Sequence, residues 1–533
     1  MARSSLLGYL ILTCFISLVI IGIGGCENAT KHYSRAAGEY ERYHKGWYEK
    51  AELVNKGERL FYRANELLYE MHPAGRISNR FHVYIDNDTL EVSFKKGKRK
   101  VDHLMVRNGM MTYQLKNTCF NKNNTVYNPA QLKEDFRQLQ NILNRLHPSL
   151  HGPITKHDFN QKCFRSHKAL ETSMSVEDFY KIVGPIVTSL GCGHTSIWMP
   201  RGYWEDSTRS LFPIEMVFLR DGVSSKRMFD NSRALPYGSR ILSVNGEPVM
   251  SLVNNLKPYI SADAYSNGYR NYRLNRRFSY LYALIYGYPN AFNIEYQPPQ
   301  SRETKSCSCE PTTVKNIRNN FEFSPVLELS FKEPERLAVI RISSFYYLNN
   351  KRFCEFVDRA FKEIYNNGTP NLIIDIRGND GGCPFCAAHL LSYLANESFT
   401  YFEEPYGKFA ELAEPVSVQE KRFQGNLFIL IDGGCFSTSG QFCSLLKYHK
   451  IGRLIGSETG GAHICNESHK IIELKNTRLR LQVARSSFGT AVEGLQKRQG
   501  IRPDDLIEQT ISEFQQGIDP VMDYAIKLCK ENI

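Results

Sequence analysis

The sequence predicts a protein of several domains in the mixed α+β class, whose C-terminal part is an α/β unit on a largely parallel sheet. Its 533 residues exceed what one hydrophobic core usually supports, since most domains hold about 100–200 residues. From Leu337 onward, short apolar runs alternate with helical segments, which is the pattern of βαβ units. The composition, 42% hydrophobic and 23% charged, is that of a globular protein and argues against a disordered chain.

A targeting segment is expected at the N-terminus. Arg3 precedes an apolar run over residues 6–23, and Ile23-Gly-Gly-Cys26 resembles a bacterial lipobox. We expect residues 1–25 to be removed as a lipoprotein signal peptide and Cys26 to be lipidated, so that the chain is held at a membrane of the bacterial cell envelope, in the periplasm or at the cell surface. The alternative is an uncleaved anchor, because the run approaches the length that spans a membrane.

Residues 26–127 are expected to contain helices followed by a small β unit. Within residues 33–72, apolar side chains recur at helical spacing, with Gly46 and Gly57 as candidate breaks in a helical hairpin. Residues 80–117 instead alternate apolar and polar positions around an Asn-Asp turn, which predicts antiparallel strands.

Residues 128–200 are predicted to be helical. Asn128 followed by Pro129 is a typical helix start, and the apolar face that follows ends at His147-Pro148. Ser175-Val-Glu-Asp178 predicts a capped start for a further helix.

Residues 205–300 are predicted to form a PDZ-like β domain. Leu235–Val249 has the signature of such domains, with Asn245-Gly246 as a hairpin turn after a strand over residues 240–244. PDZ-like domains bind an extended peptide by adding it to a sheet edge. Peptide binding and shielding of an active site both remain open as roles for this domain.

Residues 325–533 contain the segment that says most about chemistry. Leu427–Ile431 is a short apolar run typical of a buried strand, and helical spacing begins near Phe442, so that Ser437 lies on a turn at the mouth of a helix. A hydroxyl there is lifted clear of the sheet, and free N–H groups at the helix start can stabilise an oxyanion. The alternative is plain helix capping, which serine also favours.

Two further segments carry candidate site residues. Leu372–Ile376 is another predicted buried strand, and it runs into a glycine turn at Gly381-Gly382. His194 lies in a loop, Gly191–Ser196, after a predicted helix. Because active sites in parallel sheets lie beyond the carboxyl ends of the strands, we expect the glycine turn and the Ser437 turn to meet.

Five segments, in their order along the chain, resemble those of the C-terminal processing (tail-specific) serine peptidases. The resemblance is closer to the branch that contains the tricorn core and the interphotoreceptor retinoid-binding protein. The resemblance covers about residues 128–533 and implies a ClpP/crotonase-like ββα catalytic core over residues 325–533, with the helices of 128–200 as its lead-in. It also implies a hydrolase that cleaves polypeptides through an acyl-enzyme. The segments are the His194 loop, the Gly381 turn, the Ser437 turn, Leu454–Gly461 and Gly500–Asp504.

The resemblance assigns roles to individual residues. It implies Ser437 as the nucleophile and His194 as its general base. The N–H group of Thr438, with that of Gly381 or Gly382, is the expected oxyanion donor.

The acid and the alternative base are where the sequence departs from the family. Glu493 is the nearest acid ahead of Gly500 and is the expected third catalytic member. Cys192 stands two residues before the histidine, where the family usually has Asp. A Ser–Lys dyad is disfavoured, because Ala462 occupies the position about 25 residues after Ser437 where family resemblance expects lysine; the adjacent His463 is the second candidate base.

Cysteine usage and charge limit the remaining partners. The chain contains 14 cysteines, and two of them, in Cys383-Pro-Phe-Cys386, have thioredoxin-type spacing. Free thiols or a structural bridge are favoured over redox chemistry, because the peptidase hypothesis already explains the glycine turn before this segment. No second pair stands at zinc-site spacing, so we expect no metal and no cofactor. The net charge of +12 is dispersed, and the one basic run, Lys95–Lys100, is better explained as a solvated hairpin turn than as a nucleic-acid site.

A second function class stays open. A catalytically weakened peptide- or ligand-binding lipoprotein on the same fold would also lack the family's Asp and Glu, since a fold does not fix a function. A serine-directed covalent probe distinguishes the two hypotheses.

Overall fold

The computed structural model describes the backbone of the strands within residues 38–117, and then residues 126–148, 153–205, 209–230, 234–264, 266–320, 326–333, 335–346, 350–467 and 469–531. The predicted signal peptide, 1–25, and Cys26 lie outside the described residues. The chain divides into one unit of Met1–Asn123 with Pro200–Asp206 and a second of Asn124–Met199 with Ser207–Ile533. Among the helices described, none has both the length and the apolar character needed to cross a membrane.

The first unit is an antiparallel meander that closes on itself, because each strand pairs with the next and β8 pairs back with β1. The helices predicted within residues 33–72 are therefore wrong. β1 ends before Gly46 and β2 ends before Gly57, so that both expected helix breaks fall between strands. Aromatic and β-branched residues favour strands, and here this preference outweighs the helical spacing. The first four strands are β1 (Gly38–His44), β2 (Trp47–Lys56), β3 (Arg59–Ala64) and β4 (Leu67–Pro73).

The antiparallel strands predicted within residues 80–117 are confirmed. β5 (Arg80–Ile85) pairs with β6 (Asp88–Lys96), which pairs with β7 (Val101–Asn108), which pairs with β8 (Met111–Asn117). The basic run begins at the end of β6, where the chain passes to its antiparallel partner β7.

Helices open the second unit, and their starts follow the sequence signals. The side chain of Asn128 accepts the N–H of Gln131 at 3.0 Å, and the Gln131 side chain accepts the N–H of Asn128, forming the capping box of α2. Ser175 caps the later helix α4 by accepting the Asp178 N–H at 3.1 Å. These elements are α2 (Pro129–Leu146), α3 (Lys156–Lys168), α4 (Val176–Thr188) and the short strand β9 (Ser196–Trp198).

A mixed β segment follows, with strand order β10-β11-β12-β14-β15 and β13 paired with β12. Asn245 and Gly246 form the predicted turn, both with positive φ, 50° and 79°. The PDZ-like assignment stays a prediction. The segment also contains the long helix α6, which was not predicted from the sequence. Its elements are β10 (Ile214–Leu219), β11 (Gly222–Met228), β12 (Arg240–Val244), β13 (Glu247–Pro248), α5 (Val249–Leu256), α6 (Asn267–Tyr286), β14 (Phe292–Gln297), β15 (Lys305–Cys309) and α7 (Val314–Asn320).

The C-terminal sheet has the order β16-β17-β18-β21-β22-β27. β16 is an antiparallel edge strand, and all other neighbours pair in parallel, as the alternation of strands and helices predicts. The sheet and its helices consist of β16 (Leu327–Lys332), β17 (Leu337–Ile342), α8 (Asn350–Asn366), β18 (Asn371–Asp375), α9 (Pro384–Ser392), β21 (Asn426–Ile431), α10 (Thr438–Tyr448), β22 (Arg453–Gly456), β27 (Asp505–Leu506) and α12 (Pro520–Glu531).

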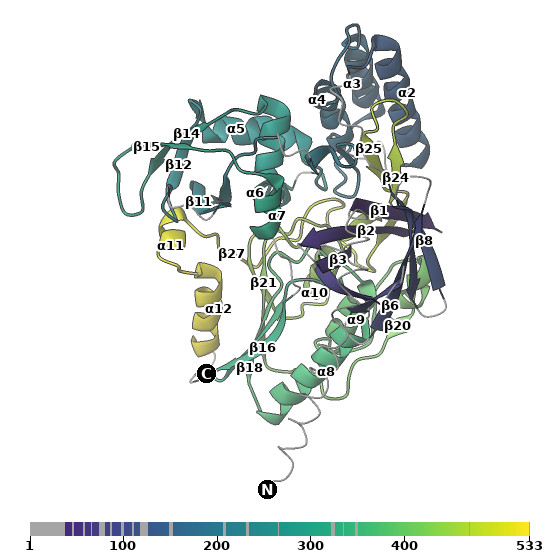
Figure 1. The fold of residues 1–533 in the computed structure, drawn as a ribbon. Helices are drawn as coiled ribbons and strands as arrows, with labels where there is room; N and C mark the ends of the chain where they lie inside the picture. The colour runs from purple at the N-terminus through teal and green to yellow at the C-terminus, as the bar shows by residue number, and fades with distance from the viewer. Residues whose placement is uncertain are drawn as a thin grey trace, which may run out of the picture. The chain divides into compact units, whose positions relative to one another are not determined.

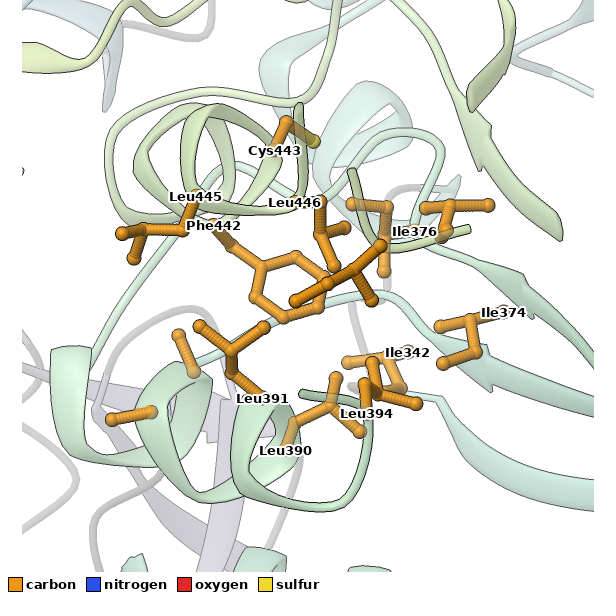
Figure 2. Packing of buried hydrophobic residues seen from close by; sticks show 14 of the residues in the cluster. Ile342, Ile374, Ile376, Leu390, Leu391, Leu394, Phe442, Cys443, Leu445 and Leu446 are labelled. Atoms are coloured by element: carbon orange, nitrogen blue, oxygen red, sulfur yellow. The ribbon is translucent and has the colours of Figure 1, made fainter. Parts of the chain in front are cut away.

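The inner strands β17, β18 and β21 are buried on both faces, which is why they read as nearly continuous apolar runs rather than as alternating patterns. Ile342, Ile374 and Ile376 pack against α9 and α10, with Phe442 at the centre of the cluster (Figure 2). Residues of the opposite face, such as Ile373 and Phe428, pack against α12. α8 and α9 thus lie on one side of the sheet and α12 on the other (Figure 1).

Short strands and turns complete the unit around the carboxyl ends of the parallel strands. β24 pairs with β25, and β25 pairs with β9, so that the strand after the His194 loop joins the C-terminal region. The remaining elements are β19 (Phe399–Thr400), β20 (Pro415–Val416), β23 (Ile464–Glu467), β24 (Lys470–Glu473), β25 (Arg480–Val483), β26 (Ser486–Gly489) and α11 (Ile511–Gln515).

Candidate active site

Ser437 stands on the sharp turn between β21 and α10. Its backbone has φ 55° and ψ −123°, a conformation that costs a non-glycine residue about 1–3 kcal/mol. A serine held in a strained strand-to-helix turn exposes its hydroxyl above the sheet, which is how nucleophilic serines are presented in other hydrolases. The Ser437 side chain makes no capping hydrogen bond. The structure therefore does not support the helix-capping alternative.

The Gly381–Gly382 turn lies directly against Ser437. Gly381 has φ 98°, and a Cβ there would stand 2.8 Å from the Cβ of Ser437. A Cβ on Gly382 would stand 2.1 Å from the carbonyl carbon of Phe345. Only glycine fits at either position without moving backbone. The turns that follow β18 and β21 thus meet, as their places in the sheet predict.

Backbone N–H groups are the candidate oxyanion donors. Thr438 is the first residue of α10, and the first N–H groups of a helix have no partner within it. The Thr438 hydroxyl donates to the Gly382 carbonyl at 2.8 Å, which holds the two turns together. The Gly381 N–H is instead donated to Asn379 Oδ1 at 3.0 Å. Of the two expected glycine donors, the geometry therefore favours Gly382 over Gly381.

Buried polar side chains fix these turns. The side-chain amide of Asn379 donates to the Ile342 carbonyl at 3.2 Å. The backbone carbonyl of Asn379 accepts the Phe436 N–H at 3.0 Å. Asp432 Oδ1 accepts the Gly378 N–H at 2.7 Å. Burial raises the pKa of Asp432, and the backbone donors oppose that rise. Asn and Asp, which commonly form hydrogen bonds with backbone groups in turns, thus hold the two turns in place.

His194 reaches the same place from the loop between α4 and β9. Its ring stacks on Phe436, the residue before Ser437, with centroids 4.7 Å apart. Phe436 in turn stacks on Tyr269 of α6, with centroids 4.2 Å apart. The His194 carbonyl accepts a hydrogen bond from Gln482 at 3.1 Å. The structure therefore brings the predicted base to the predicted nucleophile.

A sulfur atom lies between the two. Cys465 Sγ is 3.6 Å from Ser437 Oγ, and 3.8 Å and 3.9 Å from the two ring nitrogens of His194. Burial raises the pKa of this thiol well above its usual range, so the sulfur is protonated at neutral pH. In the described part of the chain, no direct hydrogen bond joins Ser437 to His194. Sequence reasoning missed Cys465, because no motif marks it.

The carboxylate beside His194 belongs to Asp263 and not to Glu493. Asp263 is 8% exposed, and its Oδ1 accepts the N–H of Gly193 at 2.7 Å. Burial raises the pKa of Asp263, while the nearby positive charge of His194 lowers it. Glu493 is exposed in the segment after β26, and its role as the third catalytic member stays a prediction. The expectation for Glu493 depended on counting along the chain, whereas Asp263 comes from a loop before α6 that carries no spacing signal.

The other residues weighed from the sequence take other places. Burial, and then Lys497, lower the pKa of His463, and no hydrogen bond to Ser437 involves it within the described residues. Cys192 is buried, and burial raises the pKa of its thiol to about 11. A thiol that stays protonated cannot replace the family's aspartate at this position as an anion.

A cavity of about 170 Å³ opens beside His194 and Phe436. Its walls include Arg273, which forms an ion pair with Asp380 at 3.3 Å, and Arg277, which lies over the Trp198 ring at 4.3 Å. Because α6 supplies both arginines, this helix forms part of the site wall. A concave space lined by aromatic rings and a few charged groups is suited to holding part of a ligand.

Comparison with known proteins agrees with this geometry. Residues 336–507 match the family model of peptidase family S41. A search of curated proteins found no match to the sequence. Among solved structures, a mutant of CPAF superimposes with a TM-score of 0.58 at 12% identity, over 76% of this chain and 97% of that chain. Mature CPAF complexed with lactacystin gives a TM-score of 0.54 at 13% identity, over 76% of this chain and 98% of that chain.

At such low identity the likeness to CPAF shows a shared fold alone. The family match covers the strands and helices that carry both catalytic turns, from β17 to β27. The predicted fold class, a mixed α+β protein, is confirmed. Residues 336–507 therefore match peptidase family S41, and the fold of the chain is similar to that of CPAF.

Proposed function

We propose that this protein is a serine endopeptidase that hydrolyses polypeptides through an acyl-enzyme on Ser437, with His194 as general base. The observation that carries the proposal is the strained turn at Ser437, which faces the Gly381–Gly382 turn and lies next to a histidine stacked on Phe436. The match of residues 336–507 to peptidase family S41 supports the reaction class.

The geometry supports a definite sequence of steps. Ser437 Oγ attacks the peptide carbonyl while His194 takes its proton, and the Thr438 and Gly382 N–H groups stabilise the oxyanion. His194 then gives the proton to the leaving amine. Water hydrolyses the acyl-enzyme by the same route. Asp263, through Gly193, positions the histidine loop and offsets the charge of the imidazolium.

Cys465 must turn aside before the proton can pass directly. Its sulfur contacts both partners at 3.6–3.9 Å, which is too long for a strong hydrogen bond and short enough to keep them apart. This contact favours a second candidate function, a weakened binding protein in which Ser437 is not activated. The experiment below separates the two.

The test is covalent labelling of the serine. Full-length protein treated with a fluorophosphonate should be modified at Ser437, and the Ser437→Ala variant should not be. Ser457→Ala, a loop serine outside the two catalytic turns, serves as the matched control and should label like wild type. Mass spectrometry of peptides from a denatured protein substrate should show new termini only with wild type and the control. Unlabelled Ser437 with intact peptide binding would favour the binding protein.

We also propose that the protein acts in the cell envelope, anchored through a lipidated Cys26. The support is the lipobox-like Ile23-Gly-Gly-Cys26 after an apolar run. Cys26→Ser should abolish lipid attachment and leave residues 1–25 uncleaved, both measured by mass spectrometry of the N-terminal peptide. A wild-type N-terminus at Met1 would contradict the proposal.

The β segment over residues 205–300 is proposed to bind the substrate peptide. Its edge strands can accept an added strand, as PDZ-like domains do. A proline placed in an edge strand should then raise KM for long peptides and leave short chromogenic substrates unaffected. Equal effects on both would favour the shielding role.

A further inference from the structure

A pair of cysteines occupies the start of α9, directly after the glycine turn. Cys383 is the N-cap residue, Pro384 is the first residue of the helix, and Cys386 follows one turn in. Both are free thiols in the structure. Cys383 is half-buried and Cys386 is fully buried. One accessible and one buried sulfur at a helix start is the arrangement in which CxxC pairs exchange disulfides.

The side chain of Asn350, at the start of α8, distinguishes the two sulfur atoms. Its amide nitrogen donates to Cys383 Sγ at 3.1 Å, and its amide oxygen accepts from Cys386 Sγ at 3.6 Å. A donor facing one sulfur stabilises a thiolate there, and an acceptor facing the other stabilises a thiol. The polarity of one amide thus assigns different protonation states to the two cysteines.

The surroundings reinforce this assignment. Hydrogen bonding from Cys386, together with the backbone N–H groups of Phe385 and Cys386, lowers the pKa of Cys383 to about 6. The same contact, followed by burial, raises the pKa of Cys386. The charge of Lys408 is close enough to interact with Cys383. Nearby Cys354 differs, since burial raises its pKa to about 11.

We propose that Cys383 and Cys386 form a redox-active dithiol–disulfide pair, with Cys383 as the attacking thiolate and Cys386 as the resolving thiol. The oxidant is a disulfide of a small thiol or of another protein. Cys383 attacks one of its sulfur atoms, forming a mixed disulfide and releasing one thiol. Cys386, losing its proton, then attacks Cys383 and releases the second thiol. Two electrons and the Cys386 proton leave the pair, and one disulfide is reduced to two thiols, one of which takes its proton from water.

The position of the pair connects it to the peptidase site. The Cys383 N–H donates to the Phe345 carbonyl at 2.9 Å, and Phe345 packs against Gly382. A disulfide between Cys383 and Cys386 therefore forms next to the proposed oxyanion donor. The redox chemistry itself does not depend on the proposed peptidase function, because its readouts are thiols and not turnover.

The first test measures thiol reactivity in unmodified full-length protein. Since only the thiolate reacts with iodoacetamide, the rate at Cys383 should rise with pH, reach half its maximum near its pKa of about 6 and then level off. At pH 7, Cys383 should react at least about tenfold faster than Cys354, measured by peptide mass spectrometry. Asn350→Ala should shift the half-maximum to higher pH. Equal rates at Cys383 and Cys354 would overturn the proposal.

The second test traps the intermediate with glutathione disulfide. Wild type should form the Cys383–Cys386 disulfide, Cys386→Ser should accumulate glutathione on Cys383, and Cys383→Ser should do neither. Cys354→Ser is the matched control and should behave like wild type. If Cys386→Ser holds no more glutathione than wild type, the pair does not exchange. Fluorophosphonate labelling of the same samples reports on the peptidase proposal separately, so either can fail without the other.

Discussion

The two halves of the active site are built in different ways. The nucleophile half, Ser437 with the Gly381–Gly382 turn, comes from two adjacent parallel strands and the turns that follow them. The base half, His194 with Asp263 and Cys465, comes from three loops or edges far apart in the sequence. Sheet topology fixes the first half, whereas the second depends on how loops pack.

The contacts reflect this difference. Asp432 accepts the Gly378 N–H, and the Thr438 hydroxyl donates to the Gly382 carbonyl, so that side chains tie the two nucleophile-side turns together. On the base side, His194 is held mainly by stacking on Phe436 and by a hydrogen bond to its own carbonyl. Stacked rings tolerate small shifts that a strained backbone turn does not. We therefore expect changes on the nucleophile side to be less forgiving than equivalent changes on the base side.

The largest expected effect tests whether the halves act as one unit. Ser437→Ala and His194→Ala should each lower kcat/KM by at least about a thousandfold, because an unactivated hydroxyl is a poor nucleophile. The double variant should be little worse than either single variant, since residues that act together are not additive. The measurement is kcat/KM on a peptide substrate. Additive losses would mean that the two residues act independently.

A single methyl group should disable the nucleophile half. Gly381→Ala would push a Cβ against Ser437, and we expect a loss of about a hundredfold in kcat, the usual cost of misplacing a reacting group by about 1 Å. Gly287→Ala is the matched control. Gly287 has a similar φ, 90° against 98°, but nothing lies within 4 Å of an added Cβ. The control should lose some thermal stability and keep its activity; an equal loss in both would point to backbone strain alone.

On the base side, Asp263 and Glu493 can be set against each other. Asp263→Asn should lower kcat by about tenfold to a hundredfold, because the amide cannot balance the imidazolium charge. Glu493→Gln should stay within about twofold of wild type, since Glu493 is exposed. The effect should also depend on pH. Burial raises the pKa of Asp263, so wild type loses this carboxylate, and activity with it, at a higher pH on acidification than an ordinary aspartate would allow. A flat profile for Asp263→Asn in that range would support this account.

The same division explains what the sequence predicted. Apolar runs that lead into glycine-rich turns predict the parallel sheet and its two turns. Because the carboxyl ends of parallel strands lie at one edge of the sheet, they also predict that Ser437 and Gly381 meet. His194 came from the resemblance, and the structure brings it to the site. Asp263 could not be found, because a buried carboxylate in a loop has no periodicity and its partner lies 70 residues away along the chain. The role of Glu493 stays a prediction, because counting residues assumes a loop path and the side chain is exposed in the structure.

The helices predicted within residues 33–72 of the N-terminal unit were wrong for a different physical reason. Aromatic positions within residues 33–72 match a helical period, but the same residues also favour strands, and periodicity cannot separate the two when glycines recur every ten residues or so. Residues 80–117 were predicted correctly because their alternation has no helical counterpart. The hydrophobic pattern therefore predicted the secondary structure correctly only where a single type of element fits that pattern.

The smallest expected effect concerns the sulfur between the two halves. Cys465→Ala removes the atom that lies between Ser437 Oγ and the His194 ring, so the two can approach directly, and fluorophosphonate labelling of Ser437 should become about threefold faster. Cys465→Met should slow it, because the longer side chain fills the same space. Cys443→Ala, which removes another buried thiol from the core behind α10, is the control and should affect stability rather than labelling rate. Slower labelling in Cys465→Ala would contradict this account. It would mean that the thiol relays the proton between Ser437 and His194, so that the sulfur connects the two halves of the site.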